Sequence, residues 1–377
     1  MAAPAMDDTA MILVLNAGSS SLKSALFAPD LTLLHTAHVA EIGGTSRLTT
    51  GGTTAQAQAP DHDTALRLIL QALADAGRPV ARLTAAAHRV VHGGADLTAP
   101  VLLTPARLAR IAAATPLAPL HNPANLACIH AMQALAPALP QTASFDTAFH
   151  ATNPAVATTY ALPAAERVKG IRRYGFHGLS YAGLVGAITP LPRRLLALHL
   201  GNGASLCAIL KGRSVATSMG YSPLDGLVMG TRAGSIDAMA VLRLAQDHGI
   251  AAAADILNRD SGLRALGGTN DMRALLGRTD PDACFAVDHF CYWAIRQAGS
   301  AIAAMGGLDA IAFTGGIGEN AGPIRDRICD GLAWAGAVPV HVVRADEERQ
   351  IARDAMSVIA ETTAPDHSGA AQDTAPR

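Results

Sequence analysis

The feature that most constrains the fold is a strand–turn–strand pattern that occurs twice, half a chain apart. The first copy has an apolar run at residues 12–15, a turn of small residues, and a second run at 22–27. The second copy has runs at 195–200 and 206–210 around a turn at 201–205. Short apolar runs between such turns are typical of buried strands. A duplication would place two related halves across a cleft, whereas chance similarity between two Gly-rich turns is the alternative.

The first turn has the chemistry of a phosphate site. Gly18 allows the backbone to approach a ligand closely. The hydroxyl groups of Ser19 and Ser21 can donate hydrogen bonds to phosphate oxygens, and Lys23 adds a positive charge. A Walker A loop would instead open a helix, and the alternating residues that follow here predict a strand. A tight hairpin with a polar tip is the structural alternative.

Length and composition narrow the class of protein. The 377 residues suffice for two domains, each with its own core. The formal net charge is -1, so the basic surface of a nucleic-acid-binding protein is not expected. The five cysteines show no metal-ligand spacing, which predicts a reduced, cytoplasmic protein. Residues 1–10 lack the apolar core of a secretory signal. Prolines interrupt the uncharged stretch 111–145, so no membrane span is expected there.

The order of the predicted elements indicates an α/β fold. For the first half we expect an antiparallel meander, an edge segment, and then helices alternating with strands, at 12–15, 22–27, 31–39, 43–60, 61–76, 85–91, 105–114, 123–135 and near 143. After the repeated pattern of the second half we expect a helix after residue 237, a helix at 282–305, strands at 310–313 and 338–343, and a helix at 346–359. The polar tail from residue 361 is expected to be disordered.

A further Gly-rich turn, residues 314–320, follows the apolar strand at 310–313. It would place bare backbone and a helix N-terminus beyond the edge of the sheet, where nucleotides often bind. The alternative is a plain strand-to-helix turn in which Asn320 caps the helix.

Five side chains elsewhere have the chemistry that a phosphate site needs. Arg89 and Arg232 lie among glycines, and each would either bind a substrate anion or form a structural pair with a carboxylate. His177 is either a polar donor or a satisfied structural histidine. Asp146 and Glu347 lie at element boundaries, as caps or as Mg²⁺ ligands. Together with the turns, these are the components of phosphoryl transfer, in which positioning and charge neutralisation supply the catalysis.

Ordered motifs along nearly the whole chain resemble the acetokinase family, which includes acetate, propionate and butyrate kinases. They occupy residues 15–23, 88–94, 119–123, 145–150, 173–178, 199–203, 229–232 and 314–320. The resemblance implies a duplicated actin-like (ribonuclease H-like) ATPase fold, with two domains around a nucleotide cleft. It implies domains at 10–148 and 149–348, with a C-terminal helix near 349–360 that packs back on the first domain. It also implies a homodimer that uses ATP, acetate and Mg²⁺, with Mn²⁺ as an alternative metal.

The resemblance implies a role for each matching residue. Those near acetate and the transferring phosphoryl group are Asn16, Ser19, Ser21, Lys23, Arg89, His121, His177 and Arg232. Among these, His177 and Arg232 would stabilise the transition state. The acidic positions are Asp146, as a catalytic residue, and Glu347, which would hold the metal together with Asn16.

The remaining matches concern the nucleotide and the acyl group. Residues beside the nucleotide would be His199, Gly201, Asn202, Gly203, Asp271, Met272, Arg273, Gly316, Ile317, Gly318 and Asn320. The methyl group of acetate would lie against Val91, Leu120, Phe176 and Pro223.

The sequence departs from the family pattern in three places. Leu179 and Tyr181 occupy two positions of a Thr-Ser-His sequence that is usual after Gly178, so a second histidine near the site is missing. Ser235 stands where Asp is common, and the segment before Asp271 is slightly shortened. We expect the core chemistry to be kept and the affinity for nucleotide or phosphate to differ.

Chemistry separates the alternative functions. Acetate, like a Glu side chain with a pKa of about 4.3, is ionised at neutral pH, so its phosphorylation requires charge neutralisation and no general base. The predicted acyl pocket leaves little room for propionate or butyrate. A sugar kinase needs a base, for which Asp146 is the only candidate. A non-enzymatic ATPase of the actin or chaperone kind has no use for Arg89 and Arg232.

Overall fold

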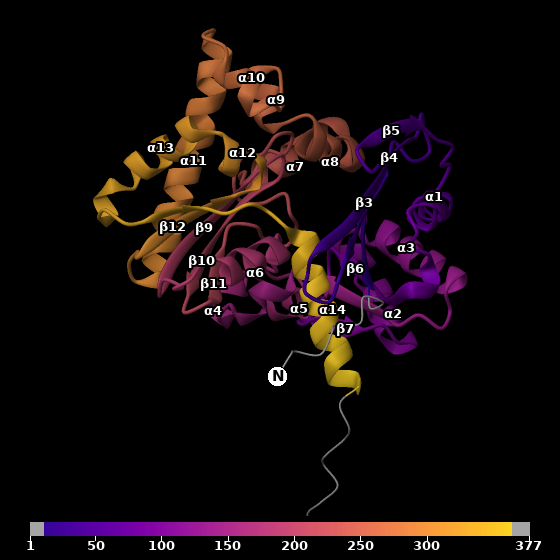
Figure 1. Ribbon diagram of the computed structural model, residues 1–377. Coiled ribbons are helices and arrows are strands. Elements are labelled where there is room, and N and C mark those ends of the chain that lie inside the picture. The colour runs from indigo at the N-terminus through magenta and orange to yellow at the C-terminus, as the bar shows by residue number, and fades with distance from the viewer. Residues whose placement is uncertain (1–10, 364–377) are drawn as a thin grey trace, which may run out of the picture.

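The structure is a computed structural model that describes residues 11–363, and it contains two mixed β-sheets (Figure 1). The first sheet has eight strands in the order β5-β4-β3-β2-β1-β6-β8-β7, and the second has five in the order β11-β10-β9-β12-β13. The strands of the first sheet are β1 (Met11–Ala17), β2 (Ser21–Phe27), β3 (Leu33–Ala40), β4 (Arg47–Thr50), β5 (Thr53–Gln56), β6 (Leu83–Val90), β7 (Val101–Leu102) and β8 (Gln141–Phe145). Those of the second are β9 (Arg194–Leu200), β10 (Ala204–Leu210), β11 (Arg213–Thr217), β12 (Ala310–Thr314) and β13 (Val340–Val342).

Both sheets contain the same arrangement of five strands. In each, an antiparallel hairpin, β1–β2 or β9–β10, continues into a third antiparallel strand, β3 or β11. On the other side, β1 pairs in parallel with β6, which pairs in parallel with β8. In the same way, β9 pairs in parallel with β12, which pairs in parallel with β13. The predicted α/β fold with two related halves is confirmed, because two turns that are similar by chance would not be accompanied by one strand order.

Helices connect the strands of each half. They are α1 (His62–Asp75), α2 (Pro105–Ala113), α3 (Asn122–Leu135), α4 (Ala155–Thr158), α5 (Ala164–Arg167), α6 (Gly178–Ala187), α7 (Ala238–His248), α8 (Ile250–Arg259), α9 (Gly262–Gly267), α10 (Met272–Leu276), α11 (Pro281–Met305), α12 (Gly315–Asn320), α13 (Gly322–Gly331) and α14 (Glu347–Thr363). Short 3₁₀ turns lie at Val80–Arg82, Thr115–Leu117, Ala148–Thr152 and Ala333–Ala335. Within residues 11–363, no helix has the length and apolar character that crossing a membrane requires.

Strand β1 is buried on both faces, as in other sheets that helices cover on both sides. Leu13 and Leu15 belong to a core that also contains residues of α1 and α3. Ile12 and Val14 point the other way and pack in a cluster with Ile351 of α14. The turn that follows β1 is therefore anchored from both faces of the sheet.

Helix α14 carries the chain from the second sheet back to the first (Figure 1). Its residues Ile351, Ala352 and Ala355 are fully buried against the first sheet. Its first residue, Glu347, thereby comes within 3.8 Å of Arg89 at the end of β6. The helix continues through Thr363, so the predicted disorder is wrong for residues 361–363. The rest of the predicted tail and the leader at 1–10 lie outside the described residues.

Other differences from the sequence-based expectations are local. The edge segment 43–60 contains the hairpin β4–β5. Asn320 does not cap a helix start, because α12 begins at Gly315 and Asn320 is its last residue, with Nδ2 donating to the carbonyl of Gly316 at 2.9 Å. Helices α4, α5, α6, α8, α9 and α10 were not predicted. Helix α12 occupies residues that were expected to form a turn, and α13 is the helix expected after that turn. In α8, only Ala253 and Leu257 are buried, which is too few to give a clear helical period.

Candidate active site

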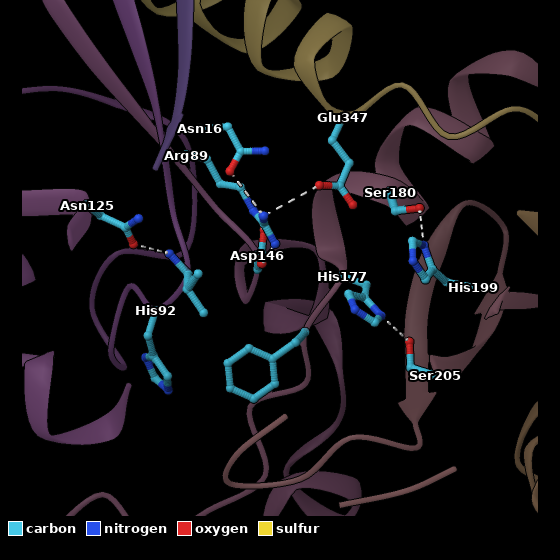
Figure 2. A network of polar contacts seen from close by, with 12 residues as sticks. Asn16, Arg89, His92, Asn125, Asp146, His177, Ser180, His199, Ser205 and Glu347 are labelled. Carbon is cyan, nitrogen blue, oxygen red and sulfur yellow. Dashed lines mark hydrogen bonds and ion pairs between the residues drawn. The ribbon is translucent and has the colours of Figure 1, made fainter. Parts of the chain in front are cut away.

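The predicted catalytic side chains gather where three strands of the first sheet end, beside the starts of two helices. Arg89 is the penultimate residue of β6, Asp146 follows β8, and Asn16 precedes the turn between β1 and β2. Glu347 begins α14, and His177 precedes α6. Figure 2 shows these five side chains in one region, although separate elements supply them.

Arg89 is held by three hydrogen bonds. Its Nε and Nη2 atoms donate to the two carboxylate oxygens of Asp146 at 3.0 and 2.6 Å, and Nη1 donates to Oδ1 of Asn16 at 3.2 Å. Burial alone would lower the pKa of Arg89, but the carboxylates of Asp146 and Glu347 outweigh it and raise that pKa. Of the two alternatives that the sequence left open for Arg89, the structural pair with a carboxylate is therefore present. A guanidinium has five N–H donors, so two remain for an anion in the cleft.

Negative charge is in excess around Arg89. Glu347 lies beside Asp146 and Glu348, and the amide of Asn16 donates to Oε1 of Glu348 at 3.2 Å. Burial raises the pKa of Glu347; Arg89 and Lys23 oppose this rise, while Asp146 and Glu348 add to it. A cation at this position would relieve the cost of holding Glu347 ionised.

The donor set fits Mg²⁺ in the form usual at phosphoryl-transfer sites. Among residues 11–363, no group of three or more His, Cys, Asp or Glu side chains is placed to hold a metal by itself. Mg²⁺ in kinases is typically bound by one or two carboxylates together with substrate phosphates. Glu347, with the amide oxygen of Asn16 beside it, provides a protein contribution of that size.

Arg232 differs from Arg89 in its partners. Its Nη1 donates to the carbonyl of Pro223 at 2.8 Å, and no carboxylate of the described chain forms an ion pair with it. Burial lowers the pKa of Arg232. A Cβ atom built on Gly203 would lie 3.6 Å from Nη2 of Arg232 and 3.1 Å from Nε2 of His177. Arg232 and His177 therefore both face the second small-residue turn.

Two histidines line this turn. The rings of His177 and His199 are stacked, with centroids 4.1 Å apart and 28° between their planes. Nδ1 of His177 lies 2.9 Å from Oγ of Ser205, and Nδ1 of His199 lies 2.8 Å from Oγ of Ser180 (Figure 2). Burial lowers the pKa of His199 to about 4 and the pKa of His177 well below 6.5. Both rings are therefore neutral at physiological pH.

The predicted nucleotide residues mostly share one pocket of about 410 Å³. Those that line it are Gly201, Asn202, Asp271, Met272, Arg273, Gly316, Ile317 and Asn320. Gly203 faces His177 instead, and Gly318 is buried, with a built Cβ 3.6 Å from the side chain of Phe313. Asp271 caps α10 by accepting the N–H of Arg273 at 2.9 Å, which fixes the wall opposite the glycines.

The predicted acyl-group residues divide between a pocket and the core. A pocket of about 360 Å³ is lined by Ser19, Leu120, His121, Pro223 and Arg232, among others. Val91 and Phe176 do not line it: both are buried, in the core cluster that contains Ala118 of the pocket wall. Leu120 is 49% exposed. Burial and then Arg89 lower the pKa of His121.

The remaining residues of the first turn have different surroundings. Oγ of Ser21 faces Gly18 across the turn, 3.0 Å from a Cβ built on that glycine. Lys23 is exposed and lines a separate hollow of about 350 Å³, which also includes Glu348. The charge of Lys23 nevertheless opposes the rise in the pKa of Glu347. Lys23 therefore lies within electrostatic range of Glu347.

Sequence reasoning missed several residues that hold the site. Asn125, on a buried position of α3, accepts the N–H of Val91 at 3.1 Å and donates to the carbonyl of Ala17 at 2.8 Å. It thereby ties the end of β6 to the end of β1. The available signal was that Asn125 lies on the same helical face as the apolar residues Cys128, Ile129 and Met132. Ser205 and Glu348 gave none, because their partners are distant in the sequence.

Two sheets that share one order of five strands define an α/β fold of the actin-like ATPase class. The chain belongs to the acetokinase family, whose model matches residues 11–365.

Individual relatives agree with this assignment. An acetate kinase of Rhodopseudomonas palustris is 44% identical over 348 residues, which cover 86% of this chain and 87% of the relative. The crystal structure of Porphyromonas gingivalis acetate kinase matches with a TM-score of 0.86 at 34% identity, covering 93% of this chain and 100% of the other. A propionate kinase from Francisella tularensis subsp. tularensis SCHU S4 matches with a TM-score of 0.87 at 34% identity, covering 92% and 98%.

Proposed function

We infer that the protein is an acetate kinase, which transfers the γ-phosphoryl group of ATP reversibly to acetate and forms acetyl phosphate and ADP. The observation that carries this inference is the convergence of Arg232, which has no carboxylate partner in residues 11–363, with Arg89 and neutral His177 around the cleft. The curated relatives named acetate kinase support the same reaction.

The mechanism follows from the charges of the reactants. Acetate and the γ-phosphate are both anions, so the barrier arises from their repulsion. We assign Arg89 and Arg232 to acetate and to the phosphoryl group in transit, with the Nε2–H of His177 donating to the same group. His121, Ser19, Ser21 and Lys23 would border that path. Transfer is direct and in line, without a phosphoenzyme.

The other matching residues are assigned to the nucleotide and the metal. The turn at 201–203 and His199 would contact the phosphates of ATP, and the pocket beside Asp271 and Gly316 would hold the adenosine. Mg²⁺, or Mn²⁺ in its place, would be held by Glu347 and Asn16 together with those phosphates. When bound, the metal would neutralise phosphate charge.

A sugar kinase on the same fold is disfavoured by the state of Asp146. Both of its carboxylate oxygens accept hydrogen bonds from Arg89, and its side chain is only 3% exposed. A general base needs a free oxygen within reach of the substrate hydroxyl. We therefore assign Asp146 to the orientation of Arg89.

Propionate is the nearest alternative substrate, since one matching structure is a propionate kinase. Val91 and Phe176 are packed in the core behind the pocket, so a longer chain would have to displace them or remain near exposed Leu120. We therefore keep acetate as the preferred substrate.

We also propose a division into domains at 10–148 and 149–348, closure of the two over the cleft, and a cytoplasmic homodimer. The two sheets support the division into domains. The proposals of domain closure, a cytoplasmic location and a homodimer rest on the family.

One assay tests the proposed function. ATP-dependent hydroxamate formation, with hydroxylamine as the trap, is measured for acetate, propionate and butyrate, and ADP release is measured for the same acids and for glycerol. We expect the highest kcat/KM with acetate and no ADP release that depends on glycerol. ATP hydrolysis that is independent of any carboxylate would contradict the proposal.

A further inference from the structure

Tyr181 is a fully buried tyrosine one turn into α6. Its hydroxyl lies 2.5 Å from Oγ of Ser205, which in turn lies 2.9 Å from Nδ1 of His177. The three side chains form a continuous chain from the core to the phosphate-facing turn.

The far end of the chain of contacts is Nε2 of His177. This atom lies 3.1 Å from a Cβ built on Gly203, in the turn that also faces Arg232. Because the ring is neutral, only one of its two nitrogens carries a proton. Which nitrogen carries it decides whether Nε2 donates to a phosphate oxygen or repels it through its lone pair.

The proton count favours one arrangement. If Tyr181 donates to Ser205, and Ser205 donates to Nδ1 of His177, then each hydroxyl proton has an acceptor and Nε2 carries the ring proton. In the reverse arrangement, Nδ1 of His177 donates to Ser205 and Ser205 donates to the hydroxyl of Tyr181. The phenol proton of Tyr181 would then have no acceptor among residues 11–363, because the other hydrogen-bond partner of this hydroxyl is the backbone N–H of His199, which is a donor. A buried unsatisfied donor is costly, so the first arrangement is preferred.

The phenol keeps its proton under all working conditions. Burial raises the pKa of Tyr181 well above 10. Its ring is fixed by neighbouring rings, with centroids 5.7 Å from that of His150 and 6.2 Å from that of Phe149. The hydroxyl is therefore a permanent donor in a fixed position, as the orientation of a neutral histidine requires.

We propose that Tyr181 is a positioning residue that, through Ser205, holds His177 in the tautomer with its proton on Nε2, so that this nitrogen donates to the phosphoryl group. The tautomer is a property of the resting protein. Its consequence for turnover rests on the proposed function of His177.

The test combines ¹⁵N NMR of histidine-labelled protein with steady-state kinetics. Tyr181→Phe removes the hydroxyl and keeps the ring, and Ser205→Ala breaks the same chain of contacts at its centre. The signals of His177 are assigned by their loss in His177→Gln. Tyr174→Phe is the matched control, because Tyr174 is also buried and its hydroxyl donates to the carbonyl of Gly170, outside the chain of contacts.

We expect wild-type His177 to show a protonated Nε2 and an unprotonated Nδ1. Both test variants should shift these signals towards a mixture of tautomers, and Tyr174→Phe should not. Turnover should fall about three- to tenfold in Tyr181→Phe, as for the loss of one neutral hydrogen bond, with the KM for ATP nearly unchanged. The double variant should be no slower than Ser205→Ala alone.

An unchanged tautomer in both Tyr181→Phe and Ser205→Ala would overturn the proposal, as would a protonated Nδ1 in the wild type. A changed tautomer with unchanged turnover would support the role of Tyr181 and instead contradict the function proposed for His177. The experiment therefore distinguishes failure of the positioning role of Tyr181 from failure of the function proposed for His177.

Discussion

Arg89 binds Asp146 through two nitrogen atoms, with Nε 3.0 Å from Oδ1 and Nη2 2.6 Å from Oδ2. The pair spans 57 residues of sequence and joins the ends of two parallel strands, β6 and β8. It fixes the plane of the guanidinium group while leaving part of its hydrogen-bonding capacity for a substrate.

This pair gives the first prediction. Asp146→Asn keeps the shape of the side chain but removes the charge that orients Arg89, so turnover should fall about 100-fold. Hydroxamate formation measures it, after circular dichroism has shown that the variant is folded. Asp309→Asn is the control, since Asp309 pairs with Arg194 away from the site. Equal turnover in the two variants would contradict the assignment.

Arg232→Ala should separate activity from stability. Arg232 forms no carboxylate pair within residues 11–363 and burial lowers its pKa, so its removal should leave the free energy of unfolding nearly unchanged. Turnover should fall about a thousandfold, as for other arginines that neutralise a transferring phosphoryl group. Arg243→Ala is the control and should retain activity, because Arg243 is an exposed side chain that pairs with Asp247 on α7, outside the pocket. Near-normal turnover of Arg232→Ala would refute its role.

Glu347 provides a prediction about pH and metal. Its pKa is raised in the folded protein, so above its ordinary value of 4.5 the ionised group destabilises the fold, and below that value this cost is lost. Without metal, Glu347→Gln should therefore raise the free energy of unfolding at pH 7 and have little effect at pH 4. Denaturant titrations at the two pH values measure this difference.

The same substitution should weaken stabilisation by Mg²⁺ and ADP. At 100 times its Kd, a ligand stabilises the folded state by about 2.7 kcal/mol. Thermal unfolding with Mg²⁺ and ADP should show a smaller shift for Glu347→Gln than for wild type. Glu361→Gln, near the other end of α14, is the matched control. A full shift in Glu347→Gln would exclude it as a metal contact.

Buried histidines predict loss of stability in acid. Burial lowers the pKa of His88 to about 4, so between that value and 6.5 the unfolded chain binds a proton that the folded protein does not. Each such histidine costs about 1.4 kcal/mol per pH unit below 6.5. His88→Gln should therefore flatten the decline in unfolding free energy between pH 6.5 and 5, whereas exposed His130→Gln should not. Parallel curves for both variants would contradict this.

The acyl pocket gives a prediction about specificity. Val91 is buried in the core cluster that backs the pocket, and Val91→Ala should create room for one more methylene group. The ratio of kcat/KM for propionate to that for acetate should rise about tenfold. An unchanged ratio would mean that the acyl chain lies elsewhere, for example along exposed Leu120.

Elements with strong local patterns could be predicted from the sequence. β1 and β9 are continuous apolar runs that end in small-residue turns, and their repetition indicated the duplicated fold. α1 carries both an apolar stripe and an N-cap at Asp61. These features depend on residues that are close together in the chain.

The parts that escaped prediction depend on distant contacts. Glu348 accepts a hydrogen bond from Asn16 across 332 residues of sequence, and no local pattern signals it. The packing of Val91 and Phe176 in one core cluster with Ala118 also joins distant parts of the sequence. The directions of the hydrogen bonds around His177 require the three-dimensional arrangement of α6 and β10.

The most direct test of the central claim, direct transfer from ATP to acetate, is the stereochemistry at phosphorus. ATP with a γ-phosphoryl group made chiral by oxygen isotopes is converted to acetyl phosphate, and the configuration of the product is determined. One in-line displacement between Arg89 and Arg232 predicts inversion of configuration. Retention would require two displacements through a phosphorylated side chain and would contradict the account.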